Sequence, residues 1–199
     1  MNNYRFSRVD EQTSVRRKGF TLVELMFTLA IMAILATLAT PALRTMVVKR
    51  TVNSQADALG SALRLARSEA IKRGQAVTVC ASLDPEAAKP QCLQGQATNW
   101  ATGWLVFVDR NTVGQLDGND PVLKVQPTFR ATGTMNNNRT AAITYRANGM
   151  IFPVDNSTFT VMPDSKDSPA SLADEIRCVT LSSAGRARIS KPDNKGVCS

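Results

Sequence analysis

One apolar segment, residues 20–40, constrains this 199-residue chain more than any other feature. It carries a single charged side chain, Glu24. As a helix rising about 1.5 Å per residue, it is long enough to cross the ~30 Å hydrocarbon layer of a bilayer. It also exceeds the apolar core of a secretory signal peptide, which holds roughly 7–15 residues. The sequence therefore predicts a membrane-inserted helix over residues 20–43, joined to one domain of ordinary size.

Basic residues set the orientation of this segment. Arg16, Arg17 and Lys18 lie directly before it, which predicts a cytoplasmic N-terminus and a head outside the inner membrane, in the periplasm. The formal net charge is +8, and most of it belongs to the chain after residue 19. A net positive charge of this size is compatible with binding to polyanions, such as nucleic acid or anionic lipid, but it is not evidence for such binding.

Glu24 is unexpected within an apolar helix. A carboxylate in the membrane costs about 2.5–3.5 kcal/mol on insertion scales, so it indicates a function. The window from Lys18 to Leu25 reads KGFTLVEL. It resembles the leader of type IV prepilins and of type II secretion pseudopilins. The resemblance implies that residues 1–19 are a leader peptide and that a prepilin peptidase cleaves between Gly19 and Phe20.

The same resemblance implies two further features of the mature N-terminus. Phe20 would be N-methylated, and Glu24 would pair with the terminal amine of a neighbouring subunit. The pairing is physically reasonable, because two opposite charges in a low-dielectric medium offset each other's desolvation only when they meet. An intramembrane glutamate without a partner is the alternative.

After Pro41 the apolar residues recur at helical spacing on one face. This pattern predicts an amphipathic helical half over residues 44–74 that ends near Gly74. The expected apolar stripe consists of Val48, Val52, Ala56, Leu59, Leu63, Ala66 and Ala70. The polar residues expected on the solvent-exposed face are Arg50, Asn53, Asp57, Arg64 and Lys72.

From residue 75 to residue 199 the period of the pattern changes to two, which predicts strands separated by turns. The fold class is therefore α+β: a long N-terminal helix packed on a mostly antiparallel sheet. The segment 163–174 is polar and predicts an exposed loop. Strands are expected at residues 77–80, 104–108, 122–125, 142–145, 159–162 and 178–181.

Two segments of the head resemble a known family. The first, from Trp100 to Leu123, contains Gly-Trp, Val-Phe-Val-Asp-x-Asn and Asp-x-x-Asp; the second runs from Leu181 to Arg186. Both are similar to the GspH/FimT family of minor pilins. The resemblance implies a type IV pilin-like fold, with other minor and major pilin subunits as partners.

Four cysteines, Cys80, Cys92, Cys178 and Cys198, follow the membrane segment. An even number outside the membrane indicates two disulfides in an oxidising compartment. Of the three pairings, Cys80–Cys92 and Cys178–Cys198 are favoured because both close short loops, each contributing roughly 3 kcal/mol. Free buried thiols are the alternative.

No enzyme, cofactor or metal is expected. The chain contains no histidine, which removes Ser-His-Asp and Cys-His catalytic arrangements and the commonest zinc ligand. A calcium loop is superficially suggested by Asp109, Asn111, Gly114, Asp117 and Asp120. However, Val113 stands at the fifth position and the closing glutamate is missing, so Asx-turn chemistry explains the same residues.

Arg186 and Arg188 form the most specific candidate for binding. In an extended segment they point the same way, about 7 Å apart, which suits two guanidiniums that each grip one phosphate. Lys191 and Lys195 follow. The element Gly-Arg-x-Arg resembles that of FimT-type minor pilins, which implies non-sequence-specific DNA binding during natural transformation. The alternative is that this segment is an ordinary solvent-exposed strand end without a binding function.

Three functions follow from these observations. The first is a minor pilin that primes, caps or enters a type IV pilus, located in the inner membrane and in the assembled filament at the cell surface. The second is a DNA receptor with the same architecture. The third is a pseudopilin of a type II secretion system, which the sequence does not separate from the first.

Overall fold

The computed structural model describes residues 19–95, 99–129, 133–152, 156–165 and 168–198, and for residues 38–42 it describes the backbone alone. Almost all of the expected leader, residues 1–18, therefore lies outside the described residues. The chain divides into two compact units, residues 1–42 and 43–199. The helix α1 (Leu22–Arg73) begins in the first unit and ends in the second.

The start of α1 is fixed by Thr21. Its Oγ1 accepts a hydrogen bond from the backbone N–H of Glu24 at 3.2 Å, and its carbonyl accepts one from Leu25 at 3.1 Å. This is N-cap geometry, in which a threonine satisfies backbone donors that have no partner within the helix. The helix therefore begins at Leu22 rather than at the predicted Phe20.

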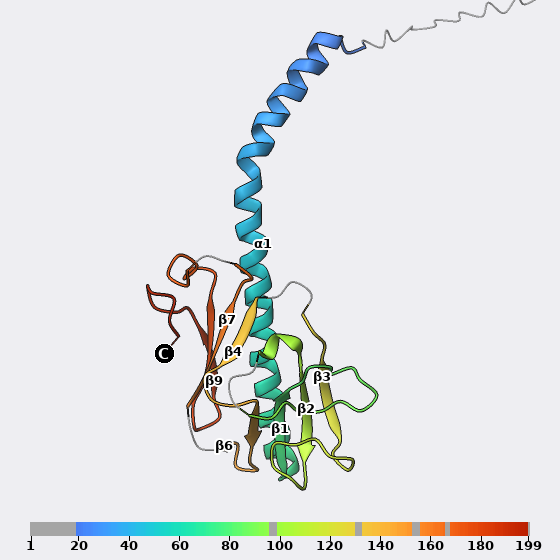
Figure 1. Cartoon of the computed structure of the whole chain (residues 1–199), viewed down its shortest axis with the longest axis vertical. Helices are drawn as coiled ribbons and strands as arrows, with labels where there is room; N and C mark the ends of the chain where they lie inside the picture. Colours follow the sequence, from blue (N-terminus) through green and yellow to red (C-terminus); the bar gives the residue numbers. More distant parts are fainter. Residues whose placement is uncertain (1–18, 96–98, 130–132, 153–155, 166–167, 199) are drawn as a thin grey trace, which may run out of the picture. The chain divides into compact units, whose positions relative to one another are not determined.

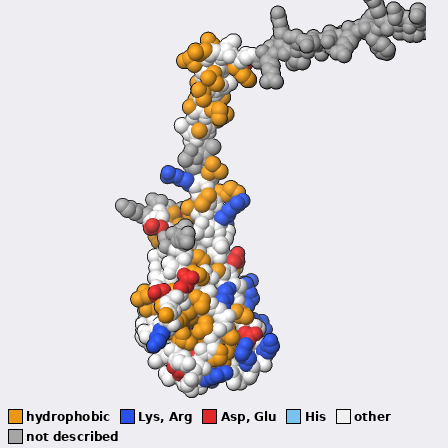
Figure 2. Space-filling view, turned by 90° about the vertical axis from the view of Figure 1, so that its right-hand side faces the viewer, with side chains coloured by type: hydrophobic (Ala, Val, Ile, Leu, Met, Phe, Trp, Pro, Cys, Tyr) orange, Lys and Arg blue, Asp and Glu red, His pale blue; other side chains and the backbone are white. Residues whose placement is uncertain are grey.

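In the first unit the apolar side chains of α1 are exposed, among them Leu22, Phe27 and Ile34. Figure 2 shows many hydrophobic side chains on the surface of this part of the helix. Part of the predicted membrane segment, residues 38–42, lies outside the described side chains. Among the described residues, no helix is both long enough and apolar enough to span a bilayer.

In the second unit α1 buries one stripe, as predicted. Six of the seven expected residues are buried, from Val52 to Ala70, and Val48 is half-buried. The expected polar positions, such as Asn53 and Arg64, are exposed. Gly74 ends the helix with a φ of 64°, a left-handed conformation that glycine adopts without steric cost.

The strands form two antiparallel sheets, where the sequence had suggested one. In Figure 1 the strands β7 and β9 of the four-stranded sheet lie to the left of α1, and the strands β2 and β3 of the five-stranded sheet lie to its lower right. The larger sheet has the order β3-β2-β1-β5-β6. Its strands are β1 (Ala76–Ala81), β2 (Trp104–Asp109), β3 (Val122–Gln126), β5 (Ala142–Tyr145) and β6 (Ile151–Phe152).

The smaller sheet has the order β4-β7-β8-β9, so β9 is an edge strand that pairs only with β8. The six predicted strands are confirmed, whereas β4, β6 and β9 were not predicted as strands. The strands of this sheet are β4 (Thr134–Asn137), β7 (Ser157–Met162), β8 (Arg177–Leu181) and β9 (Ala187–Ser190).

One hydrophobic core joins the stripe of α1 to both sheets. The short helix η1 (Trp100–Thr102) places Trp100 edge-on to Phe159 of β7, with ring centroids 4.9 Å apart. Leu59 and Leu63 of α1 are fully buried in the same core, and each contributes roughly 1.5–3 kcal/mol by leaving water. The described part of the loop 163–174 consists of turns and is largely exposed, as predicted.

Candidate functional site

The predicted processing site lies at the exposed start of the described residues. Gly19 and Phe20 precede the helix, and Phe20 is 82% exposed. Glu24 occupies the first turn of α1, where the partial positive charge of a helix N-terminus favours a carboxylate. Among the described residues its carboxylate makes no ion pair. The group is thus held in place by its backbone and remains available to another molecule.

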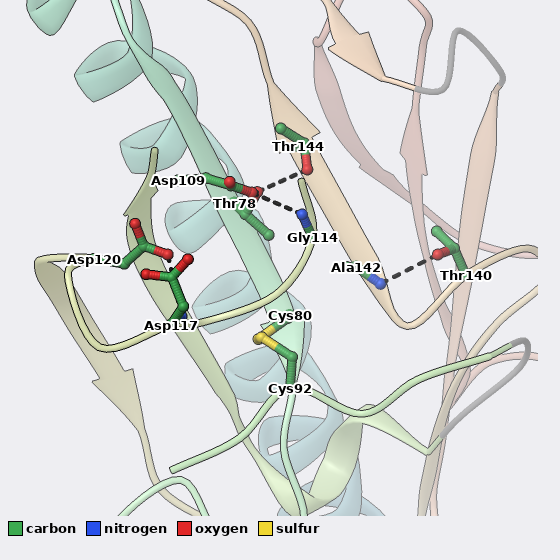
Figure 3. Close-up of a disulfide and its surroundings, with 10 residues drawn as sticks. All are labelled: Thr78, Cys80, Cys92, Asp109, Gly114, Asp117, Asp120, Thr140, Ala142 and Thr144. Atoms are coloured by element: carbon green, nitrogen blue, oxygen red, sulfur yellow. Dashed lines mark hydrogen bonds between the residues drawn. A yellow bond between two sulfur atoms is a disulfide. The ribbon is translucent and has the colours of Figure 1, made fainter. Parts of the chain in front are cut away.

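Both favoured disulfides are present. Cys80–Cys92 fastens the loop after β1 to the outer face of the larger sheet, and Cys178–Cys198 fastens the C-terminal segment to β8. Figure 3 shows the first bridge beneath the loop that follows β2. Cys80 is fully buried and packs with Leu105. The bridge is therefore part of a small second core on this face.

The carboxylate of Asp109 is used to anchor a loop. It is 5% exposed, and its Oδ2 accepts hydrogen bonds from Thr78 Oγ1 at 2.6 Å and from the N–H of Gly114 at 2.7 Å. Thr78 is also hydrogen-bonded to Thr144 at 2.7 Å. These contacts, drawn in Figure 3, hold the loop against β1 and β5.

The other acidic residues of this loop stabilise turns. Asp120 accepts from the backbone of Arg110 at 3.0 Å and of Asp117 at 3.2 Å. Asn111 donates to both carboxylate oxygens of Asp117. This is the turn chemistry that the sequence favoured over calcium binding. In the part of the chain that the structure describes, no group of three or more acidic or cysteine side chains could hold a metal ion.

Gly185 forms the turn between β8 and β9. Its φ is 75°, and a Cβ at this position would overlap the carbonyl oxygen of Gly149. The turn is closed by a hydrogen bond from Gly185 N–H to Ser182 O at 2.8 Å and by one from Ser182 N–H to Arg186 O at 3.1 Å. Glycine is therefore required here, both for the conformation and for the space.

Arg186 and Arg188 point to the same side of this hairpin, as predicted. Both are exposed, whereas Ala187 and Ile189 between them pack against the core. Arg188 lies opposite Thr180 of β8. The shared side is a shallow cavity of about 360 Å³ lined by Thr180, Ser182, Arg186, Arg188 and Ser190.

The two lysines proposed with them lie elsewhere. Lys191 donates a hydrogen bond to Asp174 at 3.2 Å, and this bond holds the pKa of the Asp174 carboxyl below its usual range. Lys195 is exposed in a turn that Asp193 organises. Neither lysine lines the cavity of the arginines. The structure thus brings together Arg186 and Arg188 but not Lys191 and Lys195.

Sequence reasoning did not single out two further groups of residues. Thr21 could have been found, because Thr-x-x-Glu before an apolar run is the signature of a capping box. Arg64 and Arg67 of α1 line a second cavity together with Arg186. Their spacing of three places them on one helix face, but their proximity to Arg186 depends on the fold.

Comparison with known families gives two matches. The model of the family described as "Type II transport protein GspH" matches residues 55–185, which is about two thirds of the 199-residue chain. The match ends directly before Arg186. The model described as "Prokaryotic N-terminal methylation motif" matches residues 15–40, which include Gly19, Phe20 and Glu24.

Two solved structures have a similar fold. Both are crystal structures of the type IV minor pilin FimU of Pseudomonas aeruginosa. The first has a TM-score of 0.54 at 23% identity and covers 73% of this chain and 95% of that one. The second, from another crystal form, has a TM-score of 0.51 at 21% identity and covers 73% and 99%. No significant match was found among curated proteins.

These matches agree with the residues described above. The long capped helix, the two antiparallel sheets and the N-terminal motif form a type IV pilin fold of class α+β. Because the family model matches more than half of the sequence, this chain is a member of the GspH family and carries the N-terminal methylation motif of prokaryotic pilins.

Proposed function

We propose that this protein is a minor pilin that takes part in the assembly of a type IV pilus, either by priming the filament or by entering it. The observation that carries the proposal is the beginning of α1. Within the matched methylation motif, Thr21 caps the helix and Glu24 stands in its first turn without an ion-pair partner among the described residues. A filament of parallel helices would supply that partner, the terminal amine of a neighbouring subunit.

Its partners would be other minor and major pilin subunits and a prepilin peptidase. The protein would sit in the inner membrane with its head in the periplasm before it enters the filament. A role as a pseudopilin of a type II secretion system is the alternative, and the printed name of the matched family supports it. The similar FimU structures support the pilus.

Fractionation separates these two functions. Filaments sheared from piliated cells should contain the chain, and its deletion should reduce surface piliation while leaving type II secretion of exoproteins unchanged. Loss of type II secretion with normal piliation would instead show that the protein acts as a pseudopilin of the secretion system.

Processing gives the first specific prediction. In cells with an active prepilin peptidase, the mature protein should begin at Phe20 and carry one methyl group on its terminal amine, because Gly19-Phe20 stands in the matched motif. Intact-mass measurement of the purified protein decides this. A Gly19→Val variant should keep residues 1–19, whereas Ser14→Val, which introduces the same side chain elsewhere in the leader, should be cut normally. A mature form of wild type that still begins at Met1 would contradict the prediction.

We propose DNA binding as a second function, supported by one cavity. Arg186 and Arg188 are exposed on the same side of β9, and only hydroxyl side chains line the cavity beside them. Guanidinium groups bind phosphate with paired hydrogen bonds, and contacts of this kind carry no base information. The contact would thus not depend on the DNA sequence. It would be useful in natural transformation.

The binding prediction concerns affinity and salt. Full-length protein in a non-ionic detergent should bind duplex DNA with a Kd on the order of 10⁻⁴–10⁻⁶ M at physiological salt, weaker as salt rises. Arg186→Ala with Arg188→Ala should remove most of this binding, as measured by fluorescence anisotropy. The thermal midpoint should hardly change, because exposed arginines contribute little to stability.

A matched control uses the lysines that lie outside the cavity. Lys191→Ala with Lys195→Ala removes the same charge from the same segment, and it should weaken binding much less than the arginine pair. Equal losses in the two double variants would assign the binding to overall charge, and absence of binding by wild type at low salt would end the DNA proposal.

A further inference from the structure

Three arginines from distant parts of the sequence line one pocket on the surface of the unit 43–199. Arg64 and Arg67 belong to α1, and Arg186 directly follows the β8–β9 turn. The pocket measures about 480 Å³, and its lining also contains Ser68, Ile71, Gly185 and Ala187. No acidic side chain lines it.

Glycines create the space in which the two helix arginines lie. A Cβ at Gly149 would stand 3.1 Å from Arg67 Nε, and a Cβ at Gly60 would stand 3.3 Å from Arg64 Nη1. Gly149 also contacts Gly185, which carries the turn before Arg186. The turn at Gly149 therefore packs closely against Arg67 of α1, and the turn at Gly185 packs against Gly149.

Two buried donors beside this pocket have no acceptor. Arg67 Nε and the hydroxyl of Tyr145 are both buried, and neither has a hydrogen-bond partner among the residues that the structure describes. The ring of Tyr145 lies against Gly185, and the tyrosine is close enough for the charge of Arg67 to influence its pKa. Burial raises that pKa, so the hydroxyl stays protonated. Buried polar groups without a partner are rare, and each needs a reason.

The three arginines also lack counter-charges. Among the described residues Arg73 is paired with Glu69 and Lys191 with Asp174, but Arg64, Arg67 and Arg186 make no ion pair. Like charges that converge on one pocket repel one another, and an anion placed between them reverses the sign of the interaction. The converging charges of the three guanidinium groups thus indicate the class of ligand, an oxyanion.

The pocket is a neighbour of the cavity described above, because Arg186 lines both. One isolated carboxylate from a partner could fill a single pocket, but a polymer with repeated oxyanions could occupy both. We propose that Arg64, Arg67 and Arg186 each engage one phosphate group, and that with Arg188 they form one path for a phosphodiester backbone from α1 across the β8–β9 turn. The proposal rests on the DNA-binding function proposed above and extends its site to the helix.

Counterion release provides the test. For full-length protein in non-ionic detergent, four engaged phosphates give a slope of log K against log[salt] of about −3.6, and thus a loss of about 150-fold between about 50 and 200 mM salt. Arg64→Gln with Arg67→Gln should reduce the slope to about −1.8 and that loss to about 12-fold. The probe is a fluorescent duplex of about 12 base pairs, roughly one helical turn.

Controls separate the possible outcomes. Lys89→Gln removes one charge from an exposed loop residue outside both cavities, and it should leave the slope unchanged. Because Arg67 is half-buried, each variant is checked for an unchanged thermal midpoint. Arg64→Gln alone, at an exposed position, should reduce the slope by about 0.9 even if the double variant is unstable.

The outcomes distinguish this inference from the DNA function itself. A wild-type slope near −1.8 that neither helix substitution changes would leave DNA binding to Arg186 and Arg188 and would overturn the extended path. No binding by wild type would end both proposals. Binding of a polyglutamate peptide as tight as that of DNA, with the same dependence on Arg64 and Arg67, would replace phosphate by an acidic protein partner.

Discussion

Replacing Glu24 with alanine should reduce the amount of this protein in sheared filaments by at least tenfold, while its amount in the membrane stays the same or rises. Removing the carboxylate lowers the cost of inserting α1. In the filament, however, it leaves the terminal amine of a neighbour without a partner in a low-dielectric medium. Breaking a buried charge pair costs roughly 3–5 kcal/mol, and about 1.4 kcal/mol corresponds to a tenfold change in an equilibrium.

Quantitative immunoblots of the sheared and membrane fractions measure this effect. Thr28→Ala is the matched control, because Thr28 lies one turn further along α1 and its hydroxyl donates to the carbonyl of Leu25 in the same helix, at 2.9 Å. That variant should enter filaments normally. If Glu24→Ala reached wild-type levels in sheared filaments, the pairing role of Glu24 would be wrong.

Loss of the disulfides should have the second-largest effect. A fragment starting at Arg44 should fold without the apolar half of α1, because the unit 43–199 contains the whole described core. Each bridge, Cys80–Cys92 and Cys178–Cys198, closes a loop for which chain entropy predicts about 3 kcal/mol. For a fragment of this size, that lowers the thermal midpoint by roughly 6–12 °C per bridge.

The measurement is thermal unfolding with and without reductant. The paired variants Cys80→Ser/Cys92→Ser and Cys178→Ser/Cys198→Ser should each lose about half of the total effect. With all four cysteines replaced, reductant should no longer change the midpoint. A wild-type midpoint that is indifferent to reductant would show that the bridges do not stabilise the fold.

Local patterns account for most of the fold. The stripe from Val52 to Ala70 predicted which face of α1 is buried, and the strands with clear alternation or a continuous apolar run were found. The strands that were missed are short. β6 holds only Ile151 and Phe152, and it exists because β5 offers it hydrogen bonds across a turn rather than because of its own propensity.

Only two of the four arginines of the candidate site could be predicted from the sequence. Arg186 and Arg188 could be found because they alternate along a strand and share one side by its period of two. Arg64 and Arg67 could not be connected with them, because more than a hundred residues separate the two pairs in the sequence. The packing of Gly149 against α1, and of Gly185 against Gly149, brings them to one pocket. Likewise, the second sheet arose from long-range pairing that no local pattern encodes.

The Cys178–Cys198 bridge has a mechanical consequence for the edge strand β9. Its four residue pairs with β8, from Leu181↔Ala187 to Cys178↔Ser190, are its entire ladder. A strand with a free end would peel away from β8 one pair at a time under tension. Here the Gly185 turn holds one end and the disulfide holds the segment beyond the other. Neither end of β9 is therefore free, so a force applied through Arg186 or Arg188 cannot peel the strand away from β8 by starting at an unattached end.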